Sequence, residues 1–438
     1  MRVSASRFAF FTWWLGLVVF GTAGVARAAG DGTPEPDRVL TLEQSVQTGL
    51  QNSQALLSAR DDVRIAQQRI VEARSLYFPT LALNMNASRY RANDPVVLPG
   101  DFGSTVLVPS SEPENFYAGR LGLRQMIYNG GRNQMNLRLA EAALEQARLR
   151  EEEIRGQVTA DGVQAFFDVL LAQKRLALTQ ETERTLAARA EIVRPGDELA
   201  RGTLDVLRTR LRRERAERRR EEERATLAFL SAVGLELYTR VGMSGELETT
   251  PVREPLPKLL ARAQEVRLEI RGTEYQREID RLAVNLTESE RNPVVAFGAA
   301  YELNNDSFPL DRSFWNATLN VNLPIFDGFA SRARIRQTRL LADQSRISRA
   351  SVEDRINREV RETYGDVLFW QSEIENRKAD LDRISDLVTR LGAGRNAAER
   401  APMLSELLAA EEAYWESIHG HRVARARLEK AVGLPLAP

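Results

Sequence analysis

Apolar and polar residues alternate strictly along residues 315–323 of this chain. Trp, Ala, Leu, Val and Leu fall on one side, and Asn, Thr, Asn and Asn fall on the other. A period of two residues predicts a β-strand with one apolar face. Residues 116–127 repeat the pattern less strictly, and residues 81–88 and 295–303 supply a partner strand for each. We therefore expect two β-hairpins.

Long helical patterns follow both hairpins. Residues 132–193 and 332–391 contain no proline, and at 1.5 Å per residue each helix would be about 90 Å long. In the second segment the apolar residues are seven apart and charged residues fill the remaining faces, which is typical of a coiled coil. The residues of this apolar row are Val360, Val367, Ile374, Leu381 and Val388.

The chain contains an internal repeat. Ile-Tyr-Asn-Gly at 127–130 recurs as Ile-Phe-Asp-Gly at 325–328, and Asp-Val-Leu at 168–170 recurs at 366–368 with the same offset of 198 residues. An internal repeat indicates one structural unit used twice. Before the strands the offset is 214 residues, so the first hairpin is 16 residues longer than the second.

The repeat and the element pattern together predict the organisation of the chain. After a signal peptide at 1–29 and a flexible leader at 30–41, the first repeat would occupy 42–235 and the second 256–434, with a linker at 236–255. Each would begin with a helix. The first would continue with a hairpin at 80–127, a long helix at 132–193 and a return helix at 203–233. The second would continue with a hairpin at 294–325, a long helix at 332–391 and a return helix at 403–432.

Turn residues mark the corners between these elements. Asn129-Gly130 and Asp327-Gly328 predict sharp strand-to-helix corners, in which the Asn and Asp side chains cap the following helix. The two copies differ in the proline-rich connection at 93–114 and in the turn at 394–402.

The N-terminus has the features of a secretory signal. Two arginines precede an apolar core at residues 8–19, and Ala26-Arg27-Ala28 provides a cleavage site. The alternative is an uncleaved membrane anchor, for which the apolar core is short. No later stretch of 18 apolar residues occurs, so an exported chain would cross a membrane only with strands. The chain has no cysteine, so it would not be lipidated.

The composition argues against an enzyme. The 61 basic and 61 acidic residues give no net charge, which is unlike a nucleic-acid-binding chain. His419 and His421 are two residues apart and do not share a helix face, so a metal site is not expected. Neither a phosphate-binding loop nor a nucleophile–base pair is recognisable, and we expect no cofactor.

The alternating strands have two interpretations. They fit a soluble sheet with one wet face, or membrane-spanning strands with a lipid face and a polar lumen face. The export signal and the hairpin arrangement favour the second. Four strands are too few to close a barrel alone, so several chains would contribute to one barrel.

The order of the elements resembles that of the TolC-like outer-membrane efflux protein family, over essentially the whole mature chain. The resemblance is carried by Leu42 with its downstream helix, by residues 128–132 and 326–328, by Gly-Thr-Leu-Asp-Val-Leu at 202–207, and by the two Val-Gly-Leu endings. It implies a mainly α fold with transmembrane β-strands. Three chains would form a 12-stranded β-barrel that continues into an α-helical coiled-coil barrel.

The resemblance also implies a function. The homotrimer would lie in the outer membrane of a Gram-negative bacterium and extend into the periplasm as a passive exit duct for efflux or type I secretion. Its partners would be a periplasmic adaptor (a membrane fusion protein), an inner-membrane RND or ABC transporter, and outer-membrane lipid. The rival interpretation is a periplasmic coiled-coil scaffold or adhesin without a channel. The exported substrate does not follow from the sequence.

In the family, the turns between long and return helices form the periplasmic tip. The resemblance places the adaptor contact at Arg201, Gly202, Thr203, Asp205 and Leu207. The second turn departs from the family pattern, and there we expect the gate charges Arg395, Arg400 and Glu406.

Overall fold

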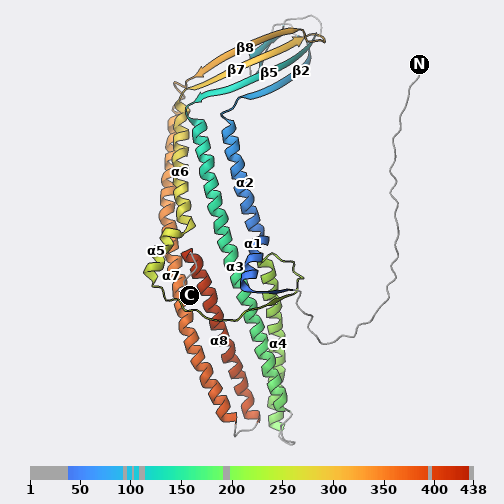
Figure 1. Cartoon of the computed structure of the whole chain (residues 1–438), viewed down its shortest axis with the longest axis vertical. Helices are drawn as coiled ribbons and strands as arrows, with labels where there is room; N and C mark the ends of the chain where they lie inside the picture. The colour runs from blue at the N-terminus through green and yellow to red at the C-terminus, as the bar shows by residue number, and fades with distance from the viewer. Residues whose placement is uncertain are drawn as a thin grey trace, which may run out of the picture. The chain divides into compact units, whose positions relative to one another are not determined.

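The computed structural model describes residues 38–91, 96–100, 103–107, 114–190, 198–392 and 397–433. The predicted signal peptide lies outside these residues. The sheet lies at one end of a set of long helices, as Figure 1 shows. The two halves of the chain have the same order of main elements: a broken helix, two long strands, a very long helix and a return helix.

The bounds of the elements are as follows. The first half holds β1 (Arg38–Leu40), α1 (Leu42–Asn52), α2 (Gln54–Ser75), β2 (Thr80–Tyr90), β3 (Val96–Gly100), β4 (Gly103–Leu107), β5 (Glu114–Asn129), α3 (Arg132–Ala190) and α4 (Glu198–Ala232). The second half holds β6 (Val241–Met243), α5 (Leu256–Val266), α6 (Leu268–Glu288), the 3₁₀ helix η1 (Ser289–Arg291), β7 (Val294–Asn305), β8 (Arg312–Asn322), α7 (Ala330–Gly392) and α8 (Ala397–Val432).

The four long strands form one antiparallel sheet in the order β2-β5-β7-β8. A row of apolar side chains crosses the whole sheet, because Leu83 is opposite Leu121, Leu121 opposite Tyr301, and Tyr301 opposite Trp315. All four are exposed, from 44% for Leu121 to 75% for Trp315. The neighbouring row is polar on three of the four strands, with Asn84, Arg120 and Glu302, and ends at Phe314 of β8. The sheet therefore has an exposed apolar face and a polar face.

The expected single helix at the start of each repeat is wrong in both copies, because a residue with extended backbone interrupts it. Ser53 separates α1 from α2, and its hydroxyl accepts a hydrogen bond from the Leu56 amide at 3.4 Å. Arg267 separates α5 from α6. Its guanidinium donates to the carbonyls of Lys430 and Ala431, both at 2.9 Å, at the C-terminal end of α8. The second break thus places the Arg267 guanidinium at the C-terminal end of α8, which carries the negative end of the helix dipole.

Two segments expected to lack regular structure pair with each other. Arg38–Leu40, at the end of the predicted leader, forms β1, which runs parallel to β6 in the predicted linker. Leu40 anchors this pair, because it is buried in a cluster with Phe166, Phe229 and Val233. Apolar burial therefore orders the end of the leader.

Both return helices begin earlier than predicted. α4 starts at Glu198 and α8 at Ala397, so Pro402 lies inside α8 instead of ending the turn. Proline removes one backbone donor from a helix. The buried Leu404 and Leu408, which pack against leucines of α3 and α4, compensate for that loss.

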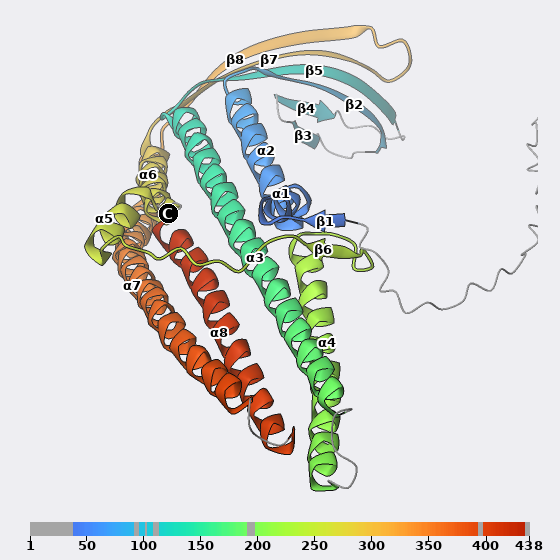
Figure 2. The same cartoon turned by 60° about the horizontal axis from the view of Figure 1, so that its bottom comes forward.

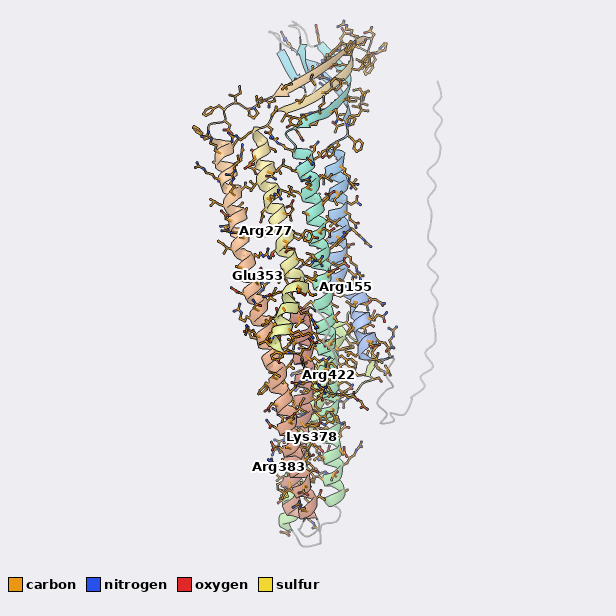
Figure 3. All side chains as sticks on the ribbon, turned by 60° about the vertical axis from the view of Figure 1, so that its left-hand side comes forward. Arg155, Arg277, Glu353, Lys378, Arg383 and Arg422 are labelled. Atoms are coloured by element: carbon orange, nitrogen blue, oxygen red, sulfur yellow. The ribbon has the colours of Figure 1, made fainter. Side chains whose placement is uncertain are left out.

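The long helices run side by side in the pairs α3–α4 and α7–α8 (Figure 2). Narrow apolar stripes hold them together. Val360 and Val367 of the predicted heptad row are fully buried against α5 and α8, as is the neighbouring Ile356. Charged side chains follow the helices along their length, including Arg277, Glu353 and Arg383 in Figure 3. These helices are therefore stabilised along seams, not by a globular core.

At both strand-to-helix corners the predicted glycines have positive φ, and the predicted Asn or Asp caps the helix that follows. Gly130 and Gly131 have φ of 70° and 86°, and Asn129 accepts a hydrogen bond from the Asn133 amide at 3.3 Å. At the second corner, Gly328 has φ of 65°, and Asp327 accepts from the Ser331 amide at 2.7 Å. Hydrogen bonds from the Ser331 hydroxyl and amide lower the pKa of Asp327.

His421 of α8 is a fully buried polar residue. Its side chain is 0% exposed, and neither ring nitrogen has a hydrogen-bond partner among the described residues. Burial, followed by the positive charges of Arg425 and Arg422, lowers the pKa of His421 from 6.5 to about 4. The folded protein therefore keeps this ring neutral.

We predict that Gly130→Ala destabilises the protein more than Gly131→Ala. A Cβ at Gly130 would lie 2.6 Å from Asn292 Cβ and 2.9 Å from the Ser289 carbonyl oxygen, whereas at Gly131 it would meet only the Met135 methyl at 3.5 Å. Both positions carry the cost of positive φ, about 1 kcal/mol, and the clash adds roughly 2 kcal/mol at Gly130. Thermal denaturation followed by circular dichroism measures the difference; equal losses would contradict the proposed crowding.

We predict that acid weakens the fold through His421. The unfolded chain takes up a proton near pH 6.5 and the folded chain only near pH 4, so stability is lost as the pH falls through this window. The loss is about 3 kcal/mol when complete. His421→Leu should remove this part of the pH dependence without a loss of stability at neutral pH. Thermal midpoints of both proteins between these pH values test this, and parallel curves would refute it.

Candidate functional site

The predicted adaptor-contact residues lie on the first turns of α4, at the end of the helices far from the sheet (Figure 1). Arg201, Gly202 and Asp205 are exposed, and Thr203 is half-buried. Leu207 is partly buried against a cluster formed by Leu186, Leu204, Leu211, Leu404 and Leu408. Leu207 therefore contributes to packing between helices, while the charged residues face outward.

The predicted gate charges are only partly placed. Arg395 lies outside the described residues, and the side chain of Arg400 does too. Glu406 is exposed on α8. Among the described side chains, neither Asp205 nor Glu406 forms an ion pair. Of these charges, Asp205 and Glu406 are thus exposed and unpaired within the described part of the chain.

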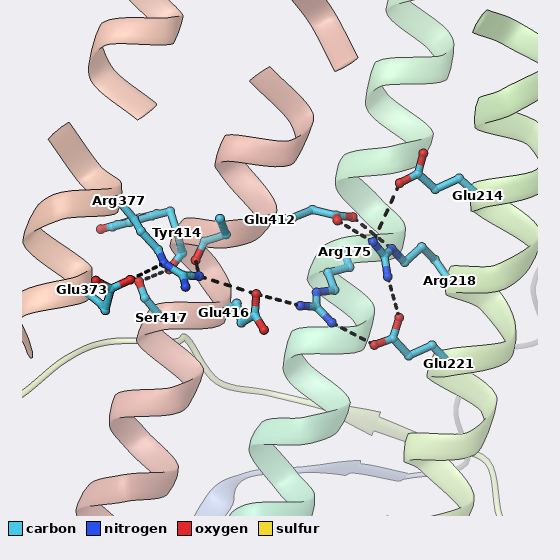
Figure 4. Close-up of polar contacts among 11 residues, drawn as sticks. Arg175, Glu214, Arg218, Glu221, Glu373, Arg377, Glu412, Tyr414, Glu416 and Ser417 are labelled. Atoms are coloured by element: carbon cyan, nitrogen blue, oxygen red, sulfur yellow. Dashed lines mark hydrogen bonds and ion pairs between the residues drawn. The ribbon is translucent and has the colours of Figure 1, made fainter. Parts of the chain in front are cut away.

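The structure instead shows a polar layer between the helix pairs, which the sequence analysis missed. Arg218 of α4 binds Glu412 of α8 with two hydrogen bonds, from Nε at 3.0 Å and from Nη2 at 2.5 Å (Figure 4). The Arg218 Nη1 also donates to Glu221 at 3.0 Å. A bidentate pair of this kind fixes the orientation of both side chains, so it locks α4 against α8.

The layer continues to the other two helices. Arg175 of α3 donates to Glu221 at 2.9 Å and lies 3.5 Å from Glu416 of α8. Glu416 is also 3.5 Å from Arg377 of α7, which donates to the Ala413 carbonyl at 2.9 Å. Figure 4 shows this series of contacts crossing from α7 to α4. One polar layer therefore joins four helices from both halves of the chain.

Because the Arg218–Glu412 pair is largely buried, the attraction between the two charges is strong, and the loss of either one would be costly. The Glu412 side chain is 12% exposed and Arg218 is 23% exposed. Burial raises the pKa of Glu412, and the attraction of Arg218 only partly opposes this effect. For Arg218, burial alone would lower the pKa, but the attraction of Glu412 and Glu221 and the hydrogen bonds to both carboxylates together outweigh burial and raise the pKa. Removing either partner would leave the other charge poorly solvated.

A second polar contact joins the two halves nearby. His419 Nε2 of α8 lies 2.7 Å from Asp168 Oδ1 of α3. The sequence does not predict this contact, because the two residues are 251 positions apart. Among the described side chains, the structure contains no cluster of three residues able to hold a metal ion.

Only one sequence signal pointed to the polar layer. Residues 208–224 are dense in charge, and pairs three or four residues apart on a helix attract each other; one such pair, Glu214–Arg218, is 3.8 Å apart in the structure. The cross-helix partner Glu412 is 194 residues away in the sequence.

Among the described helices, there is no apolar stretch of the length that a membrane-spanning helix needs.

Comparisons with known proteins agree with this architecture. Residues 46–228 match the sequence model of a family described as outer membrane efflux protein. Protein CyaE of Bordetella pertussis is 24% identical over 340 residues, which cover 72% of this chain and 68% of CyaE.

Solved structures share the fold. CusC has a TM-score of 0.74 and 15% identity, with 90% of this chain and 92% of CusC covered. The open state of the Neisseria gonorrhoeae MtrE outer membrane channel has a TM-score of 0.71 and 16% identity, with 90% and 89% covered. The sequence match and the shared fold lead to one conclusion: residues 46–228 carry an outer membrane efflux protein domain, and the chain has the fold of these solved outer-membrane channels.

Proposed function

We propose that this protein is the passive outer-membrane exit duct of an efflux pump or a type I secretion system, and that it works as a homotrimer. The observation that carries the proposal is the exposed apolar row Leu83, Leu121, Tyr301 and Trp315, which crosses the entire sheet. A soluble protein rarely exposes so continuous an apolar face. Lipid is the environment in which such a face is stable.

The edges of the sheet support a trimer. In the described chain, β2 and β8 each pair on one side only. Unpaired backbone groups are costly in lipid, so a spanning sheet must close. Three copies of a four-stranded sheet would give twelve strands, and the polar row with Asn84, Arg120 and Glu302 would face the lumen.

The helices would continue the duct into the periplasm. A periplasmic adaptor would bind the outward-facing residues at the start of α4, where Asp205, Val206, Arg210 and Arg213 line a groove. An inner-membrane RND or ABC transporter would supply the energy.

We also propose that the polar layer around Arg218 and Glu412 keeps the tip helices closed. It lies between the leucine cluster of the tip and the phenylalanine cluster around Phe166. Two apolar surfaces that separate must expose area to water, whereas ion pairs can exchange partners at a cost of roughly 1–3 kcal/mol. A docked adaptor that binds the separated arrangement more tightly would open the duct.

We predict that Leu319→Arg prevents membrane insertion and that Asn320→Arg does not. The two neighbours lie on opposite faces of β8, and Leu319 is 63% exposed on the apolar face. An arginine facing lipid near the middle of a strand costs about 2–4 kcal/mol. Insertion into liposomes and conductance in planar bilayers are the measurements.

The wild-type protein should conduct, and Asn320→Arg should conduct at an altered level. Equal insertion by both variants would show that the apolar face does not contact lipid. A wild-type protein that stays monomeric or dimeric in water without detergent would support the scaffold interpretation instead.

We predict that the double variant Arg218→Ala/Glu412→Ala, which removes the ion pair without adding apolar contact, conducts more in the absence of an adaptor than the wild type. Losing about 2 kcal/mol of closed-state stabilisation corresponds to roughly thirtyfold more open channel. Asp205→Ala/Glu406→Ala is the matched comparison, because these exposed charges form no ion pairs among the described side chains. A larger effect in that second variant would place the gate at the tip and not at the polar layer.

A further inference from the structure

A basic groove lies where the helices meet the sheet. The end of α6, η1 and the first turns of α7 form it, with a volume of about 440 Å³. Its lining includes Arg291, Arg332, Arg336 and Arg339, with Ile335 and a single acidic residue, Glu288. Ile335 is 8% exposed, so it supplies an apolar lining beneath the cationic groups.

The groove has an excess of positive charge. Glu288 is occupied by Arg339, whose Nη2 lies 2.7 Å from its Oε1. Arg291, Arg332 and Arg336 are exposed and have no carboxylate partner among the described side chains. Three guanidinium groups on one groove form a site for an anion, and their planar donors match phosphate oxygens.

Exposed apolar residues adjoin the same groove. Arg332 lies 5.4 Å from the centre of the Phe329 ring, and Phe329 packs against Phe326 at 5.5 Å. Phe329 is 58% exposed, Phe326 75% and Ile325 92%. These residues follow β8 directly and extend its exposed apolar face toward the helices. Aromatic residues at the end of a membrane strand typically lie at the headgroup level.

We propose that this groove binds the headgroup of an anionic phospholipid in the periplasmic leaflet of the outer membrane. The guanidinium groups of Arg291, Arg332 and Arg336 would hold the phosphate, while Phe326 and Phe329 contact the start of the acyl chains. The apolar neighbours favour a lipid over free phosphate, because a soluble anion gains nothing from exposed phenylalanine rings. The inference rests on the proposed outer-membrane location.

The test measures lipid retention by native mass spectrometry of the full-length trimer, released from micelles that contain phosphatidylglycerol or phosphatidylcholine with the same acyl chains. Wild type should retain phosphatidylglycerol preferentially. Arg332→Gln/Arg336→Gln should lower that retention roughly twenty-five-fold, because each of the two basic groups near an anionic headgroup contributes roughly a factor of five. Arg346→Gln/Arg355→Gln is the matched control, since both arginines are exposed on α7 farther from the sheet.

The outcomes separate the two proposals. If the trimer conducts in bilayers but retains both lipids equally, or if the control variant loses phosphatidylglycerol equally, the lipid site is wrong and the duct stands. Displacement of phosphatidylglycerol by inorganic phosphate alone would show that the groove binds the free anion and overturn the lipid assignment. If the wild-type protein neither inserts nor conducts, both proposals fall.

Discussion

An antiparallel sheet with an exposed apolar face and two half-paired edges is the constraint on which the structure depends. Neither feature is stable in water, and both are satisfied when copies of the chain close the sheet within lipid. The register aligns Leu83 with Trp315 across all four strands, so the apolar face is continuous. The corners at Asn129 and Asp327 then set the direction in which α3 and α7 leave the sheet.

The long helices alternate apolar and polar layers along their length. The phenylalanine cluster around Phe166 and the leucine cluster around Leu204 lie on the two sides of the Arg218–Glu412 layer. The apolar layers give most of the stability, since burial contributes about 25 cal/mol per Å². The polar layer fixes how the helices are oriented against one another, and its ion pairs can rearrange with little change in buried area. In the proposed duct, this division would let one set of helices be stable as a tube and still separate at its tip.

Local pattern predicted much of the fold and little of the polar layer. Period-two alternation located β8, and the proline-free heptads located α7, because both signals depend only on neighbouring residues. The break at Arg267 was not predictable, since it is stabilised by carbonyls at Lys430 and Ala431. Glu412 was missed for the same reason. From the sequence, a charged residue on a helix is expected to face water. Only the folded structure shows that Glu412 binds Arg218, 194 residues away.

The two corners differ in a way that the proposed trimer explains. Gly130 is crowded by Ser289 and Asn292, which precede the next hairpin of the same chain, whereas nothing lies within 4 Å of a Cβ at Gly328. With the 214-residue offset of the repeat, Ser289 and Asn292 correspond to Ser75 and Phe78. In a closed trimer these residues of the next copy would pack against Gly328. Phe78, 68% exposed in one chain, would then be covered, so the open corner is the place that a neighbouring copy fills.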